Sequence, residues 1–253
     1  GIPGPPRSIR LSAAGQVFLE DARRLLADAG QAAQRARLAS RGEAGQLALG
    51  YTSSAALHPD VPRLIRAFQA SYPRIRLKSQ ENATRDLLES VAGGALDAAF
   101  VRASSRRYPA LQSVVLARET MLAALPSDHP LARESTPLPL SRLAGEAFVL
   151  YRRADGPGVQ DELLDACRRS GFEPRVVADV PRLLSAVMLV AAGTGVTVVP
   201  RTLRSLHQDA VIYRELDPAS AFTIPLNLVC RAGPADSPVA RFAQLAGQDR
   251  PPA

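Results

Sequence analysis

The stretch LALGYTSSAALHPDVPRLIRAFQASYPRIRLKSQENATRDLLESVAGGALDAAFV, residues 47–101, decides the fold of this 253-residue chain. Short apolar runs alternate here with two segments that carry apolar residues at helical spacing, 59–71 and 84–92. The apolar runs are 47–51, 75–79 and 98–101. This alternation predicts an α/β fold with parallel strands. Because the helical connections are right-handed, the carboxyl ends of these strands should meet at one edge of the sheet.

Hydroxyl-bearing residues and one arginine follow these strands. Ser53 and Ser54 come after the first strand, Thr84 after the second and Arg102 after the third. In such folds the loops beyond the carboxyl ends of strands face the ligand crevice, where hydroxyls and an arginine suit a small organic anion. Each hydroxyl taken alone is explained by an ordinary helix N-cap, and Arg102 by a solvated strand end. Their coincidence at one edge favours an anion site.

A second strand–helix series occupies the later part of the chain. Strands are expected at 148–151, 175–178 and 196–199, and helices at 159–170 and 181–192. Tyr151 and Arg152 follow the first of these strands. The second series therefore predicts another α/β unit of similar construction.

Two extended stretches, near 118–122 and 221–225, look like crossings between the two series. Strands expected at 114–117 and 121–125 lead into the second series, and a strand at 224–231 returns from it. The pattern predicts two lobes joined by two crossover strands, with a cleft between them. A single continuous sheet also fits it.

Ahead of the α/β part, residues 12–40 have the spacing of one long alanine-rich helix, which Ser12 can cap and Gly42 ends. A heptad seam runs along it through Phe18, Ala22, Leu25, Ala29, Ala32, Ala36 and Ala39. So narrow a seam buries too little apolar area to fold alone, which predicts pairing with a second copy. The alternative is a helix lying on the surface of its own domain.

The formal charge of +7 is concentrated toward that helix. Residues 1–41 hold seven arginines and three acidic residues. A basic helix end suits proximity to phosphates, and compositional bias explains it equally well. The 46% apolar content, with no apolar run long enough to span a membrane, predicts a soluble globular chain without a membrane partner.

The sequence offers no catalytic or metal-binding arrangement. Its three histidines have no acidic or thiol partners at ligand spacing. Nucleophile-elbow and phosphate-loop motifs are missing. Cys167 and Cys230 fall in segments expected in different parts of the fold, which predicts free thiols in a reducing compartment. We therefore expect no metal, no cofactor and no enzymatic activity.

Several motifs resemble LysR-type transcriptional regulators. PRSIRLSAAG (6–15) and FLEDARRLL (18–26) are similar to the end of the DNA-binding wing and the start of the linker helix in that family. GALDAAFVR (94–102), LPSDHPLA (125–132) and VAAGTGVTVVP (190–200) resemble its effector domain. The resemblance covers nearly the whole chain, and the order and spacing of the motifs make it specific.

This resemblance implies a linker helix at 12–41 and an effector domain of two Rossmann-like lobes of the periplasmic-binding-protein type. Lobe I would comprise 46–118 and 225–247, and lobe II 122–222. Residues 1–11 would be a tag or the remnant of a wing, because the winged helix-turn-helix of the family is missing. DNA sequence would then be read only through that missing part.

The family's effector contacts map onto Ser53, Ser54, Thr84 and Arg102 and, from the second lobe, Tyr151 and Arg152. The expected function is effector-controlled transcription in the cytoplasm by a dimer or tetramer. A solute-binding protein of the same bilobal fold is one alternative, but it would not need the paired helix. A small-molecule enzyme on that fold is another, and it would need positioned acid–base groups.

Overall fold

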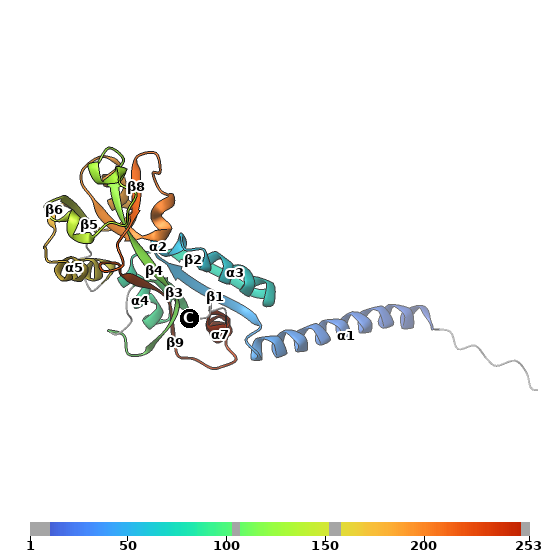
Figure 1. The fold of residues 1–253 in the computed structure, drawn as a ribbon. Helices are drawn as coiled ribbons and strands as arrows, with labels where there is room; N and C mark the ends of the chain where they lie inside the picture. Colours follow the sequence, from blue (N-terminus) through green and yellow to red (C-terminus); the bar gives the residue numbers. More distant parts are fainter. Residues whose placement is uncertain (1–10, 103–106, 152–157, 249–253) are drawn as a thin grey trace, which may run out of the picture.

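The computed structural model describes residues 11–102, 107–151 and 158–248. It shows two lobes and a helix, α1 (Ala13–Ser40), that projects from the first lobe (Figure 1). Residues 1–10 of the expected tag or wing remnant (1–11) and the predicted ligand residue Arg152 lie outside the described part. None of the described helices is both long and apolar enough to cross a membrane.

The first lobe contains the predicted strand–helix series. It begins with β1 (Ala44–Tyr51), α2 (Ser53–Ala56), α3 (Asp60–Ser71), β2 (Arg74–Glu81), α4 (Thr84–Gly93) and β3 (Ala98–Val101). Strand β1 lies between β2 and β3 and is parallel to both, which confirms the predicted parallel strands. The short helix α2 was not predicted, because its residues Ser53 and Ser54 read as a loop.

The chain returns to this lobe at its end through β9 (Thr223–Arg231) and α7 (Pro238–Gln248). Strand β9 runs antiparallel to β3. Helix α7 packs on the same face of the sheet as α3, where Phe68 and Phe242 meet edge to face with ring centroids 5.0 Å apart. Helix α4 covers the opposite face with Leu87, Leu88 and Val91.

The second lobe is built from the second series and several short 3-10 turns. Its elements are η1 (Pro130–Arg133), η2 (Leu140–Leu143), β5 (Ala147–Tyr151), α5 (Val159–Arg169), β6 (Arg175–Val180), α6 (Leu183–Ala191), β7 (Thr197–Pro200), η3 (Arg201–Ser205) and β8 (Val211–Glu215). Strands β5 and β6 are parallel. The lobe has its own hydrophobic core, to which Phe148, Leu163 and Val187 belong.

One long strand joins the lobes. The sequence suggested separate strands at 114–117 and 121–125, and this prediction is wrong, because β4 (Leu111–Pro126) is continuous over 16 residues. It pairs with β9 in the first lobe and with β7 and β8 in the second, so the main sheet runs β2-β1-β3-β9-β4-β7 with β8 also on β4. The crossing expected near 118–122 lies inside this strand. The main sheet therefore runs through both lobes, while β5 and β6 form a separate two-stranded sheet in the second lobe.

The two cysteines lie in different cores, as predicted. Cys167 belongs to the core of the second lobe and Cys230 to that of the first, and both are free and buried. Burial raises the pKa of the Cys167 thiol to about 11. Neither thiol is therefore a ready nucleophile at neutral pH.

Helix α1 buries none of its residues. Ser12 caps it by accepting a hydrogen bond from the Gly15 N–H at 3.1 Å, as predicted. Phe18 and Leu25 of the predicted seam are 74% and 67% exposed, so the helix does not lie on its own lobe. Its apolar side chains are open to a partner.

Candidate functional site

The structure brings four of the six predicted ligand residues to one edge of the first lobe. Tyr51 is opposite Glu81 on one side and Phe100 on the other, so β1, β2 and β3 end together. The hydrogen bonds from the Asn82 N–H to the Tyr51 carbonyl and from the Thr52 N–H to the Phe100 carbonyl fasten these ends. The residues that follow are Ser53, Ser54, Thr84 and Arg102.

The three predicted hydroxyls are not helix caps. Thr52 caps α2, accepting a hydrogen bond from the Ala55 N–H at 3.2 Å, and Ser53 and Ser54 lie inside that short helix. Ala83 occupies the N-cap of α4, so Thr84 is its first helical residue. The capping explanation that the sequence left open does not account for Ser53, Ser54 or Thr84.

Arg102 is buried in an ion pair rather than exposed at a strand end. Its Nη1 donates to Glu119 Oε2 at 2.6 Å, and these two side chains are only 3% and 5% exposed. Its Nη2 donates to the Ser54 carbonyl at 3.2 Å and to the Thr202 hydroxyl at 3.3 Å. The Thr202 N–H in turn donates to Glu119 Oε1 at 2.5 Å. Because Thr202 belongs to η3, this network links the two lobes across β4.

The pKa shifts of Glu119 and Arg102 show that each charge stabilises the other. Burial alone would raise the pKa of Glu119, but Arg102 and the hydrogen bonds from Thr202 outweigh it and hold that pKa below its usual value. Burial lowers the pKa of Arg102, and the attraction of Glu119 opposes this shift. Among the described residues, the Nε of Arg102 is one of the few buried polar atoms without a hydrogen-bond partner.

Sequence reasoning did not find Glu119. It lies in β4, most of whose residues are apolar although Arg118 and Thr120 flank it, and an acidic residue inside such a strand was the available signal. A buried carboxylate there requires a cation, and Arg102 supplies it.

Tyr151 is buried and its hydroxyl is already used. The hydroxyl donates to the Val198 carbonyl at 2.6 Å, which fastens β5 to β7. Burial raises the pKa of this tyrosine well above its usual value, so the side chain stays neutral. Its aromatic ring packs in the core of the second lobe.

A second link between the lobes was also missed by sequence reasoning. Arg182, the N-cap residue of α6, donates through Nη1 to Glu81 Oε1 at 3.3 Å. These two side chains are 39% and 48% exposed. Helix α6 also packs against α2, which carries Ser53 and Ser54. Arg182 therefore comes from the second lobe to the same strand-end edge as the predicted hydroxyls.

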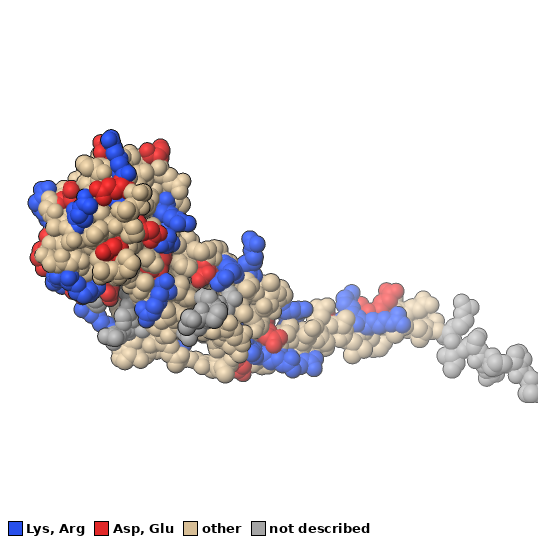
Figure 2. All heavy atoms as spheres, in the orientation of Figure 1, with Lys and Arg blue, Asp and Glu red and all other residues tan. Residues whose placement is uncertain are grey.

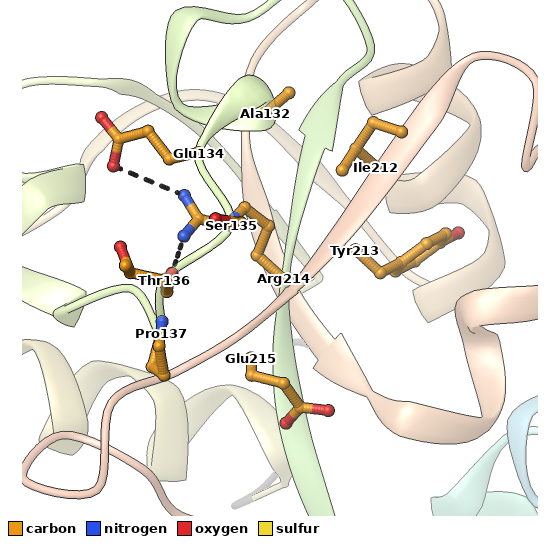
Figure 3. A pocket seen from close by; sticks show the side chains of 9 residues that line it. All are labelled: Ala132, Glu134, Ser135, Thr136, Pro137, Ile212, Tyr213, Arg214 and Glu215. Carbon is orange, nitrogen blue, oxygen red and sulfur yellow. Dashed lines mark hydrogen bonds and ion pairs between the residues drawn. The ribbon is translucent and has the colours of Figure 1, made fainter.

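A hollow of about 270 Å³ lies elsewhere, in the second lobe between η1 and β8. Figure 3 shows Arg214 extending from β8 toward Glu134 and Thr136. Arg214 donates to the Leu131 carbonyl at 2.7 Å and to the Thr136 carbonyl, so this cation holds the neighbouring turn in place. None of the five predicted ligand residues that the structure describes, Ser53, Ser54, Thr84, Arg102 and Tyr151, lines the hollow.

Basic and acidic side chains are interspersed over the face of both lobes that Figure 2 shows, and side chains of both signs also occur along α1. On α1 Arg24 pairs with Asp21 at 2.6 Å, an exposed pair.

Known proteins are similar to this chain in sequence and architecture. Residues 40–249 match the LysR substrate binding domain. The HTH-type transcriptional regulator YnfL of Escherichia coli strain K12 is 34% identical over 201 residues, which are 79% of this chain and 67% of that protein. The crystal structure of CbnR, a LysR family transcriptional regulator, superposes with a TM-score of 0.82 at 28% identity over 95% of this chain and 82% of that chain. The BenM effector binding domain with its effector benzoate has a TM-score of 0.68 at 24% identity, covering 81% and 91%.

Proposed function

The chain belongs to the LysR family of transcriptional regulators, and from this premise we propose that it binds a small organic anion between its two lobes and thereby controls transcription. The two lobes, 46–118 with 225–247 and 122–222, would bind the ligand. The linker helix at 12–41 would transmit the effect of binding. The protein would act in the cytoplasm.

The observation that carries the proposal is the convergence of Ser53, Ser54 and Thr84 at the joint end of three parallel strands. Hydroxyls at this edge can donate hydrogen bonds to an oxygen-rich ligand. The second lobe approaches the same edge through α6 and η3. A ligand held there would contact both lobes, and its binding would favour one arrangement of them over another.

A binding screen tests this function. We expect a member of a panel of small carboxylic acids (benzoate, 4-hydroxybenzoate, succinate, adipate and citrate) to raise the melting temperature, because a ligand that binds only the folded state stabilises it. The matching amides should not. Stabilisation by the amides alone would contradict the anion class, and a flat response to every acid would contradict the function.

Thr84→Ala locates the ligand, with Ser90→Ala on the same helix as the control. Loss of a hydroxyl that bonds the ligand should weaken binding by roughly twofold to tenfold. Ser90 lies farther along α4, away from the strand ends, and its replacement should leave the affinity unchanged. Equal affinities for the two variants would place the ligand elsewhere.

We also propose that α1 pairs with a second copy of the chain through the seam from Phe18 to Ala39. The exposure of Phe18 and Leu25 supports this, because monomeric proteins rarely leave such a row of apolar side chains in water. Ala29→Glu with Ala32→Glu should dissociate the oligomer by placing charges in the seam. Ala27→Glu with Gln34→Glu, on the opposite side of the heptad, is the control. If light scattering gives the seam variant and the control variant the same mass as the parent protein, the seam is not the pairing interface.

A further inference from the structure

We propose that Arg182 is the residue that pairs with the ligand's carboxylate, and that it does so by exchanging its partner Glu81 for the ligand. This deepens the proposed function and rests on it. The sequence placed that role on Arg102, whereas the geometry points to an arginine from the opposite lobe.

Arg102 is poorly suited to receive an anion. Its two Nη groups already serve Glu119, the Ser54 carbonyl and the Thr202 hydroxyl, and only Nε has no partner. Its charge is neutralised by a carboxylate 2.6 Å away in a buried setting. Removing one member of such a pair leaves an uncompensated buried charge, so Glu119 cannot readily be displaced.

Arg182 has the opposite properties. Its partner is 3.3 Å away and both side chains are more than a third exposed. An exposed ion pair contributes little free energy, since water solvates either member as well. The pair can therefore open at low cost and leave the guanidinium free for another carboxylate.

The position of Arg182 suits this role. Glu81 is the last residue of β2 and lies directly opposite Tyr51, the last residue of β1. Ser53 follows Tyr51 by two residues, and Thr84 follows Glu81 by three. The guanidinium that contacts Glu81 therefore lies at the strand-end edge from which Ser53 and Thr84 also follow. A carboxylate at this point can accept hydrogen bonds from the hydroxyls of one lobe and from the guanidinium of the other.

The exchange breaks one ion pair and forms another. The Nη1–H bond to Glu81 is lost, Glu81 turns to water, and the guanidinium donates to the ligand's carboxylate. No net charge is left unpaired at Arg182 in either state. The direct link between the lobes is replaced by one that passes through the ligand, so ligand binding is registered by both lobes.

Opposite effects of the two neutral variants test the exchange. In calorimetric titration with the tightest-binding acid of the panel, Arg182→Gln should bind at least about tenfold more weakly than the parent protein. Glu81→Gln should bind about twofold to fivefold more tightly, because it removes the competitor. The double variant should match Arg182→Gln, since Glu81 acts only through Arg182. The amide of the same acid should show none of these differences.

The control is the exposed pair of Arg168 with Glu173, 3.2 Å apart in the second lobe. Arg168→Gln and Glu173→Gln make the same changes in net charge and should leave the affinity unchanged. If Arg182–Glu81 is only a structural link, both of its variants will shift the affinity in the same direction, which overturns the exchange. Unchanged binding by Arg182→Gln also overturns it while leaving the proposed function standing. Failure of the parent protein to bind any acid overturns both.

Discussion

Two arginine–carboxylate pairs take part in joining the lobes, and they differ in their exposure to water. Arg102 and Glu119 are almost fully buried and share Thr202 with the second lobe. Arg182 and Glu81 lie at the surface and have only each other in the described contacts. The same chemistry therefore serves different purposes, because a buried pair resists exchange with a ligand and an exposed one permits it.

We expect the largest loss of stability when the buried pair is broken. Glu119→Ala leaves the Arg102 cation buried without its counter-charge, and we expect the free energy of unfolding to fall by about 3–5 kcal/mol. Urea denaturation measures this loss. Glu173→Ala, which breaks an exposed pair, should cost no more than about 1 kcal/mol. Similar losses in both variants would remove the distinction between buried and exposed pairs.

Acid should weaken the buried pair in a predictable direction. The pKa of Glu119 is held below its usual value of 4.5, so its contribution to stability is complete above that pH and is lost as the pH falls through the folded-state pKa. The stability difference between the parent and Glu119→Gln should therefore narrow as the pH falls below 4.5. Burial also lowers the pKa of His58, which gives a loss of the same sign starting nearer its usual value of 6.5. A difference between parent and variant that stays constant with pH would contradict this role for Glu119.

Thr202→Val tests how much the second lobe contributes to the buried pair. It removes the hydroxyl, which accepts from Arg102 and also hydrogen-bonds Glu119, but keeps the backbone N–H that donates to Glu119. We expect the free energy of unfolding to fall by about 1–2 kcal/mol, which is about 1 kcal/mol for each hydrogen bond lost. A loss as large as that of Glu119→Ala would mean that the buried pair depends on the hydroxyl as much as on the carboxylate.

The smallest expected effect on stability is at the exposed pair. Arg182→Gln should change the free energy of unfolding by less than about 1 kcal/mol, and added salt should abolish the difference through screening. The loss caused by Glu119→Ala should persist in the same salt. A large and salt-independent loss from Arg182→Gln would show that this pair is structural and would argue against its exchange.

The fold was largely predictable from local patterns. The spacing of apolar residues located α3, α4 and the parallel strands β1, β2 and β3, and the direction of parallel strands placed Ser53, Ser54, Thr84 and Arg102 at one edge. The helix α1 followed from its periodicity and its cap at Ser12. These properties depend on residues a few positions apart, so the sequence by itself determines them.

The partners of the charged groups were decided only by the tertiary structure. Arg102 finds Glu119 because β4 is one continuous strand beside β9, and the sequence had suggested two strands there. Arg182 meets Glu81, 101 positions away, because α6 of one lobe packs against α2, the short helix that follows β1 in the other. Local spacing carries no information about such distances. Which arginine is free to bind an anion depends on burial and on the nearest carboxylate, and only the packing of the two lobes sets these.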